Sequence, residues 1–187
     1  MKDTLISRRE FLKDIGMIGA GVLLSASPWL SAFSEVVETS GEKCRLAIIG
    51  PGSRGRFLMS FLVQNPKVEI VALCDIYKPS IEKALELAPK AKVYDDYREI
   101  LEDKTVDAVL VATPLNSHCQ IVLDAFDAGK HVFCEKSIGF TMEECFRIYN
   151  KHISTEKVFF TGQQRLFDPR YIKAMEMIHA GTFGEIN

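Results

Sequence analysis

Arg45-Leu-Ala-Ile-Ile-Gly50-Pro-Gly52-Ser-Arg-Gly55-Arg-Phe-Leu58 decides the fold, because a short apolar run here ends in Gly-x-Gly-x-x-Gly and passes directly into a helical pattern. The pattern predicts a strand, a phosphate-binding turn and a helix. Gly50 allows the tight turn off the strand, Gly52 leaves the backbone open to a pyrophosphate, and Gly55 lets the helix pack close to the sheet. The free amides and the positive end of the helix dipole then face the phosphates.

A second apolar run, from Val68 to Cys74, ends at Asp75, which lies 20 residues beyond Gly55. A carboxylate at this position accepts hydrogen bonds from the hydroxyls of an adenosine ribose. The alternative, an ordinary turn followed by a surface aspartate, explains less of the pattern. Because the carboxylate would repel a 2′-phosphate, Asp75 favours NAD over NADP. Arg54 and Lys78 are close enough in the sequence to soften that preference, so NADP stays open.

The composition is that of a globular chain, with 187 residues, 47% hydrophobic content and a net charge of −2. The 23 lysines and arginines nearly balance the 25 acidic residues and form no basic stripe, so binding to a nucleic-acid backbone has no electrostatic basis. The cysteines show no C-x-x-C and no paired metal spacing, so we predict no metal site, and a structural disulfide has no support. They are expected to be small buried hydrophobic side chains and are Cys44, Cys74, Cys119, Cys134 and Cys145.

Residues 1–34 have the pattern of a twin-arginine export signal. Arg8 and Arg9 follow a serine and precede Phe-Leu-Lys, and a Gly- and Ala-rich apolar stretch from Ile15 to Leu24 comes next. A basic amphipathic tail that happens to carry two arginines fits the pattern less well. The signal predicts passage through the twin-arginine translocase to the periplasm, although it defines no single cleavage site. Residues 35–43 are then a polar linker.

From Cys44 onward, apolar strands alternate with helical patterns, which predicts a doubly wound α/β fold of the Rossmann type. We assign it to residues 44–163, and residues 164–187 to the start of a second, α+β domain. Further strands are expected at Lys92–Tyr94, Val106–Ala112, His131–Cys134 and Lys157–Gly162, and helices at Pro79–Ala88, Tyr97–Leu101 and behind a capping box at Thr141–Glu144. The residues expected to be buried on helices are Phe57, Leu58, Phe61 and Leu62, then Ile121, Val122, Ala125 and Phe126. A last helix has an apolar stripe that would normally face partner structure and would be exposed without it, formed by Tyr171, Ile172, Met175 and Ile178.

The polar motifs all follow predicted strands. The glycine turn, Asp75, the segment Thr113–His118 and the pair Glu135-Lys136 each come directly after an apolar run. Ligands of an open parallel sheet bind at the carboxyl ends of its strands, so four such loops converging on one edge predict the binding site.

Together these motifs resemble the glucose-fructose oxidoreductase, inositol dehydrogenase and MocA (Gfo/Idh/MocA) family, from about Arg45 to Asn187. The resemblance rests on the Gly-Pro-Gly-Ser-Arg-Gly turn, Cys-Asp75, Thr113-Pro-x-x-x-His118, the run from Gly129 to Lys136, Gln163-Gln-Arg165 and Phe167-Asp-Pro-Arg170-Tyr171. It implies that the Thr-Pro loop lies along the cofactor and that Glu135 lies near the nicotinamide ribose. Lys136 would reach the nicotinamide side and the reacting hydroxyl of the substrate.

Ser137 and His118 differ from the other residues in and beside these motifs. Serine stands at position 137, where the family pattern has proline after Glu-Lys, and this leaves open how rigidly Lys136 is presented. His118 is expected to cap or orient the Thr-Pro loop and is not assigned as a base. The predicted site therefore has Lys136 as its catalytic residue, and its cofactor-binding residues are Gly50, Gly52, Ser53, Arg54, Gly55, Asp75, Thr113, Pro114, Asn116, His118, Glu135 and Lys136.

The resemblance implies an NAD(P)-dependent oxidoreductase that transfers a hydride to or from a hydroxyl carbon of a sugar or cyclitol. An exported glycosidase that transiently oxidises a sugar is the first alternative, although that branch often lacks the Glu-Lys pair. The second alternative is a binding module for sugar or dinucleotide without catalysis. In the family, a further domain supplies the substrate pocket and the oligomer contacts, and the sequence stops at Asn187. We therefore expect this chain to bind a dinucleotide but to turn over poorly, and a homo-oligomer where the second domain is present. The particular sugar does not follow from the residues.

Overall fold

The computed structural model describes residues 43–163, 165 and 168–184. The predicted export signal and all of the predicted linker except Lys43 lie outside the described residues. The chain divides between Gln163 and Gln164 into two units, which are described separately.

The larger unit is built on one sheet of six strands in the order β3-β2-β1-β4-β5-β6, and every neighbouring pair is parallel. The strands are β1 (Cys44–Ile49), β2 (Val68–Cys74), β3 (Lys92–Tyr94), β4 (Ala108–Val111), β5 (His131–Cys134) and β6 (Phe159–Thr161). The chain first moves outward from β1 to β3 and then returns to place β4 on the other side of β1. The predicted doubly wound α/β fold is confirmed, and its topological switch point lies between β1 and β4.

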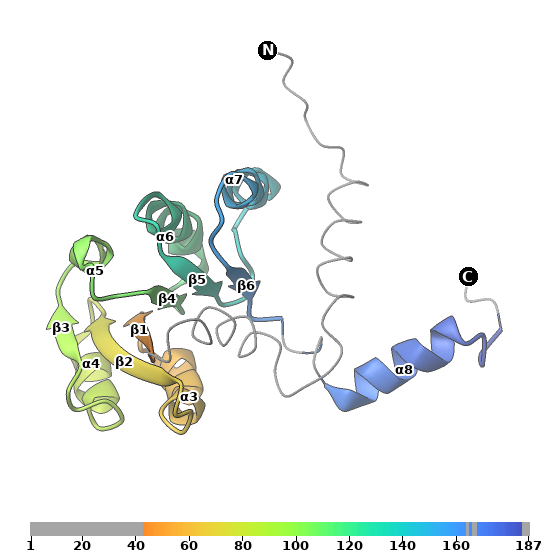
Figure 1. Cartoon of the computed structure of the whole chain (residues 1–187), viewed down its shortest axis with the longest axis horizontal. Helices are drawn as coiled ribbons and strands as arrows, with labels where there is room; N and C mark the ends of the chain where they lie inside the picture. Colours follow the sequence, from red (N-terminus) through yellow and green to blue (C-terminus); the bar gives the residue numbers. More distant parts are fainter. Residues whose placement is uncertain (1–42, 164, 166–167, 185–187) are drawn as a thin grey trace, which may run out of the picture. The chain divides into compact units, whose positions relative to one another are not determined.

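Helices cover both faces of the sheet (Figure 1). One face carries α3 (Ser53–Leu62) and α4 (Lys78–Leu85), and the other carries α5 (Tyr97–Glu102), α6 (Leu115–Asp127) and α7 (Met142–Ile153). The predicted capping box starts α7, since the Thr141 hydroxyl accepts from the Glu144 amide at 3.2 Å and the Glu144 carboxylate accepts from the Thr141 amide at 3.3 Å.

One part of the core lies between the sheet and α5, α6 and α7, and a second part lies on the other face, where Met59 and Leu62 of α3 and Ile81 and Ala84 of α4 are buried. Strands buried on both faces are almost continuously apolar, and β4 is buried along its whole length. The predicted buried face of α6 is confirmed, because Ile121, Val122, Ala125 and Phe126 are all buried against these strands. Burial of Ile121, Val122 or Phe126 stabilises the fold by roughly 1.5–3 kcal/mol each.

The predicted buried stripe of α3 is wrong in part. Phe57 and Phe61 are 53% and 57% exposed and pack edge to face on each other, whereas the buried residues are Gly55, Met59 and Leu62. Gly55 sets this rotation, since it lies against the carbonyl of Gly50 and the positions four and seven residues later share its face. The glycine turn, and not the hydrophobicity of the phenylalanines, therefore decides which side of α3 faces the sheet.

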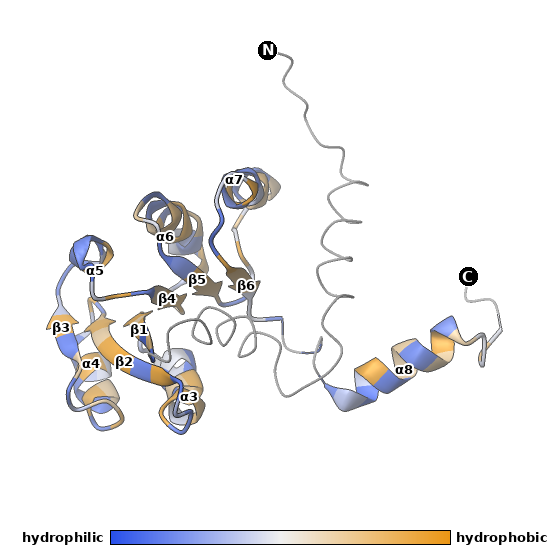
Figure 2. Ribbon diagram, viewed as in Figure 1, coloured by the Kyte–Doolittle hydropathy of each residue, from blue (hydrophilic) through white to orange (hydrophobic). Residues whose placement is uncertain are grey.

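The smaller unit contains α8 (Pro169–His179), whose N-cap Asp168 accepts from the Arg170 amide. Figure 2 shows hydrophobic and hydrophilic bands alternating along it. None of its residues is buried: Tyr171 and Met175, which belong to the stripe expected to face partner structure, are 41% and 49% exposed. None of the helices in the described part of the chain is both long and apolar enough to cross a membrane.

Candidate functional site

Three glycines shape the turn between β1 and α3, and they do so in different ways. Gly50 has φ +85°, and a Cβ atom there would lie 2.7 Å from the amide nitrogen of Thr113. A Cβ atom on Gly55 would lie 2.5 Å from the carbonyl oxygen of Gly50. A Cβ atom on Gly52, by contrast, would meet nothing within 4 Å. Gly50 and Gly55 allow close packing, and Gly52 leaves an open backbone surface of the kind a pyrophosphate needs.

The first turn of α3 continues that open surface. Gly52 is the N-cap, no side chain among the described residues caps the helix, and Ser53 is exposed at its first position. The first amides of a helix have no partner within it, and they carry the positive end of the helix dipole. A phosphate group placed against Gly52 would satisfy them, so the residues present fit a dinucleotide.

Asp75 lies half-buried at the end of β2. Its Oδ1 atom accepts from the Tyr77 amide at 2.9 Å, so one oxygen is used locally. The surroundings are acidic: besides burial, the charges of Asp96, Asp75, Asp95 and Glu99 raise the pKa of the Cys74 thiol to about 11. A negative potential at this end of the edge favours ribose hydroxyls over a 2′-phosphate.

Arg54 does not lie toward Asp75. Its Nε atom is 2.8 Å and its Nη2 atom 2.7 Å from Oε1 of Glu135, at the end of β5. The expectation that Arg54 softens the NAD preference of Asp75 is therefore corrected. The guanidinium is committed to another carboxylate, a pairing that no spacing in the sequence indicates.

The loop after β4 is tied to the loop after β5 by His118. This side chain is buried, with Nε2 at 2.8 Å from the Thr113 carbonyl oxygen and Nδ1 at 2.7 Å from that of Ser137. Both ring nitrogens are engaged with backbone oxygens, so neither faces a substrate proton. Pro114 is the N-cap of α6, and Asn116 is exposed in its first turn.

Glu135 and Lys136 follow β5 with opposite environments. The Glu135 side chain is only 7% exposed, and its Oε2 atom accepts from the Lys136 amide at 3.2 Å. Lys136 itself is exposed, which leaves its ammonium accessible at the carboxyl edge, and the peptide bond from Lys136 to Ser137 is cis. All the predicted site residues thus lie in the loops that follow β1, β2, β4 and β5 or in the first turns of α3 and α6, which follow two of these loops.

Gly162, which follows β6, belongs to this site but was not among the residues predicted for it. A Cβ atom on Gly162 would lie 2.8 Å from Oε1 of Glu135, so the carboxylate fills the space that a side chain would occupy. The Gly162 amide also donates to the Cys134 carbonyl at 2.8 Å, one residue before Glu135. The only signal for this role was a glycine at the end of an apolar strand, which is too common a pattern to identify a site.

The cysteines are not part of this site. All five are free thiols, four are buried, and burial raises the pKa of Cys44 to about 12 and that of Cys134 still further. The expectation of small buried hydrophobic side chains is confirmed for these four, and Cys145 is half-buried. In the described ranges, no group of three or more His, Cys, Asp or Glu side chains is arranged to hold a metal ion.

Comparison with known proteins identifies the kind of fold that carries this edge. Residues 44–163 match the model of the oxidoreductase family with an NAD-binding Rossmann fold (GFO_IDH_MocA). A crystal structure of myo-inositol dehydrogenase from Lactobacillus casei in complex with NAD(H) and myo-inositol is 32% identical and superposes with a TM-score of 0.71 over 74% of this chain and 42% of its own.

Two curated relatives match almost the whole chain. A glycosyl hydrolase family 109 protein of Stenotrophomonas maltophilia is 32% identical over 97% of this chain and 40% of its own length. An alpha-N-acetylgalactosaminidase of Shewanella oneidensis is 29% identical over 97% of this chain and 44% of its own. The chain thus spans less than half the length of each of these relatives.

Proposed function

The chain belongs to the oxidoreductase family with an NAD-binding Rossmann fold, and from that premise we propose that it is the cofactor-binding part of an NAD-dependent oxidoreductase acting on a sugar or cyclitol. The observation that carries the proposal is the open surface at Gly52, bounded by the packed Gly50 and Gly55 at the switch point of the sheet. Asp75 and Lys136 stand at the same edge, where the ribose and the reacting centre would be placed.

The chemistry that bound NAD supplies is hydride transfer at its nicotinamide ring. The residues of this chain would bind and orient the reactants. The amides of the first turn of α3 hold the pyrophosphate, and Asp75 accepts from the adenosine ribose. Lys136 would hold the reacting oxygen of the substrate; its neutral amine would accept the hydroxyl proton on oxidation, and its ammonium would return that proton on reduction. His118 keeps the two loops beside the nicotinamide in register.

The substrate class is inferred from the relatives. The Lactobacillus casei enzyme was solved with NAD(H) and myo-inositol, a polyol ring with secondary hydroxyls. Such hydroxyls are the groups that an exposed lysine beside a nicotinamide can polarise. We therefore propose a secondary hydroxyl of a cyclitol or a sugar as the reacting group.

A second candidate is an NAD-dependent glycosidase that oxidises a sugar carbon, eliminates the aglycone and returns the hydride. The glycosyl hydrolase family 109 protein and the alpha-N-acetylgalactosaminidase favour it, since both match over 97% of this chain. Product analysis on a nitrophenyl glycoside with the longest natural form of the protein separates the two. Release of nitrophenol without net NADH indicates the glycosidase, and NADH formation from the free sugar or cyclitol indicates the oxidoreductase.

Export through the twin-arginine translocase is also part of the proposal, and the periplasm is the proposed location. It is supported by the arginine pair at positions 8 and 9 and the apolar stretch that follows. Replacement of both arginines by lysine should retain the protein in the cytoplasmic fraction. Equal periplasmic amounts of the variant and the parent would contradict this route. We further propose that the longest natural form of the protein is a homo-oligomer, and light scattering tests this.

The first experiment is to purify the longest natural form under native conditions, denature it and identify the released dinucleotide by mass spectrometry. Retained NAD supports the proposed site and the preference set by Asp75, whereas retained NADP would contradict that preference. A protein that is empty and gains no thermal stability from added NAD contradicts the cofactor site. That result would favour a fold retained without catalysis.

A further inference from the structure

Arg54 and Glu135 form an ion pair that crosses the switch point of the sheet. Arg54 is the second residue of α3, directly after the pyrophosphate turn, and Glu135 directly follows β5. In the sheet order β4 lies between β1 and β5, so the pair spans the end of β4. It connects the loop expected to hold the phosphates with the loop that carries Lys136.

The Glu135 carboxylate is held from three directions. Arg54 donates to Oε1 at 2.8 Å through Nε, with Nη2 at 2.7 Å from the same oxygen, and the Lys136 amide donates to Oε2 at 3.2 Å. Gly162 forms the third side, since any Cβ atom there would lie 2.8 Å from Oε1. One nearly buried carboxylate thus joins the segments that follow β1, β5 and β6.

The guanidinium of Arg54 is itself oriented. Its Cζ atom lies over the ring of Phe57, 5.2 Å from the ring centroid, and the arginine side chain is 39% exposed. Phe57, which the sequence pattern placed in the core, thus supports Arg54 from the solvent side of α3. A planar guanidinium can stack on this ring and place two nitrogens on Glu135 at once, which a lysine ammonium cannot do.

We propose that Arg54 is a positioning residue: through Glu135 it fixes the loop bearing Lys136 relative to the pyrophosphate turn, so that both ends of a dinucleotide are bound together. The inference rests on the proposed NAD site. If the pair is broken, the nearly buried carboxylate beside Lys136 loses its guanidinium partner, and it can draw the loop into other arrangements. The adenosine end of the site, at Asp75, does not depend on the pair.

The test compares the affinity of the chain for NAD with its affinity for 5′-AMP, by titration calorimetry, in the parent protein and in Arg54→Met. We expect Arg54→Met to weaken NAD binding about 10-fold and 5′-AMP binding less than about twofold. The matched control is Arg45→Met, which removes an arginine of similar exposure from the Arg45–Asp107 ion pair and should leave both affinities unchanged. Equal losses for Arg45→Met and Arg54→Met would overturn the inference.

A double-variant cycle separates positioning from direct phosphate contact. In the Glu135→Gln background, Arg54→Met should weaken NAD binding by less than about twofold further, because the pair is already broken. A full 10-fold loss in that background would show that Arg54 contacts the ligand directly, and would overturn the positioning role.

Gly162→Ala provides a test that changes no charge. The new Cβ atom displaces the end of a flexible side chain, so the fold should persist while the carboxylate shifts. We expect a several-fold weaker NAD affinity with unchanged 5′-AMP affinity and unchanged melting temperature; unchanged NAD affinity would contradict the inference. A parent protein that does not bind NAD overturns the proposed function as well, whereas a parent that binds while Arg54→Met binds equally tightly overturns only the role of Arg54.

Discussion

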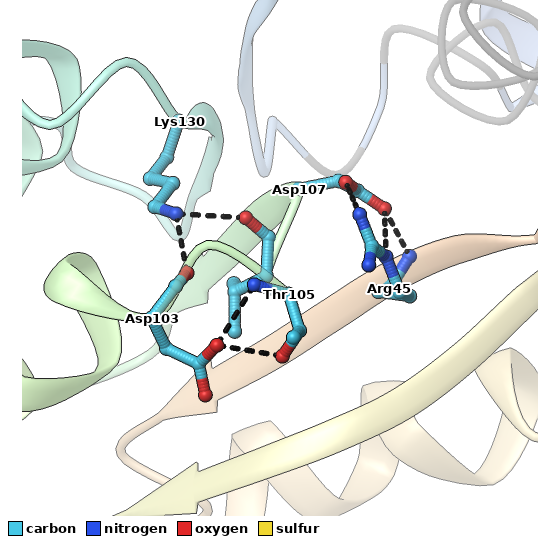
Figure 3. Close-up of polar contacts among 6 residues, drawn as sticks. Arg45, Asp103, Thr105, Asp107 and Lys130 are labelled. Atoms are coloured by element: carbon cyan, nitrogen blue, oxygen red, sulfur yellow. Dashed lines mark hydrogen bonds and ion pairs between the residues drawn. The ribbon is translucent and has the colours of Figure 1, made fainter.

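The sheet has an amino edge, where its parallel strands begin, and a carboxyl edge, where they end. Each edge carries an arginine paired with a carboxylate, but in the described part of the chain only at the amino edge do the neighbouring side chains leave no open surface beside the pair. At the amino edge, Asp107 accepts from the backbone amide, Nε and Nη2 of Arg45, with side-chain exposures of 32% and 40% (Figure 3). At the carboxyl edge, Arg54 is as exposed, at 39%, while Glu135 is 7% exposed. The first pair joins the starts of neighbouring strands, and the second crosses over a strand to reach the loop of Lys136.

The neighbours of each pair show the same contrast. Figure 3 shows the Lys130 ammonium beside the amino-edge pair, where it donates to the carbonyl oxygens of Asp103 and Val106 at 2.7 and 2.8 Å. The Asp103 carboxylate is in turn held by Thr105 and Tyr94. At the carboxyl edge, Gly52 faces open space and Lys136 is exposed. The closed edge stabilises the fold, and the open edge is left for a ligand.

The largest expected effect comes from the two glycines of the larger unit that have positive φ, Gly50 at the carboxyl edge and Gly129 at the amino edge. Gly50→Ala strains the backbone at positive φ and places the new Cβ atom 2.7 Å from the Thr113 amide nitrogen. The substitution should destabilise the protein by about 4 kcal/mol and abolish NAD binding. Gly129→Ala, at φ +70°, meets only Lys157 at 3.8 Å and should cost about 1 kcal/mol without affecting NAD. Denaturant unfolding and NAD titration measure both, and similar behaviour of the two variants would remove the distinction between the edges.

The next effect separates two lysines. Lys130→Met leaves two backbone carbonyls without their ammonium partner and should destabilise the protein by about 3 kcal/mol, with NAD affinity unchanged in the folded fraction. Lys136→Met removes an exposed ammonium and should change stability by less than about 0.5 kcal/mol while abolishing turnover in the longest natural form. Unfolding curves and turnover assays of both variants provide the test. An active Lys136→Met protein would argue for a different catalytic residue.

A smaller effect is expected for Asp75→Asn, which keeps an acceptor for the Tyr77 amide and removes only the charge. NAD binding should weaken about 10-fold, equivalent to about 1.4 kcal/mol, and the preference for NAD over NADP should shrink. The matched variant Asp107→Asn at the amino edge should lower stability and leave the preference unchanged. An unaltered NAD to NADP ratio in Asp75→Asn would mean that the surrounding carboxylates set the preference.

The smallest effect is a pH dependence of stability that arises at the amino edge. Burial lowers the pKa of His131, and the charge of Lys157 lowers it further, while the His131 Nδ1 atom accepts from the Val158 amide at 2.9 Å. Burial also lowers the pKa of His152. Because the unfolded chain then binds more protons, the free energy of unfolding should be level above the ordinary pKa of 6.5 and fall as the pH drops below it toward the native pKa values. Urea unfolding at about pH 7 and about pH 5 tests this, and a level profile would contradict the buried, neutral histidines.

Much of the fold could be predicted because its signals are local. Strands β3 and β5 begin and end at the predicted residues, since each has a valine followed by an aromatic residue in a short segment bounded by polar residues. The capping box of α7 needs only residues three apart in the sequence. The position of the site edge followed from strand order alone, because every motif comes after a strand and all the strands are parallel.

The failures have one physical cause, which is that helix rotation and ion pairing depend on what another segment places nearby. The hydrophobic pattern of α3 predicted that Phe57 and Phe61 face the sheet, but the contact of Gly55 with the Gly50 carbonyl turned them to the solvent. Arg54 was expected to influence Asp75 because the two are close in the sequence. Its actual partner, Glu135, is 81 residues away and comes close only when β4 and β5 are in place.

The sequence by itself therefore determined the parallel doubly wound sheet, the glycine turn and the set of loops that meet at one edge, because periodicity, glycine and the connection of strands by helices are properties of neighbouring residues. The tertiary structure alone decided which face of α3 is buried, that His118 bridges two loops, and that Gly162 makes room for the carboxylate bound by Arg54. These contacts join segments distant in the chain, and their energies depend on distances of a few ångströms that no local pattern specifies.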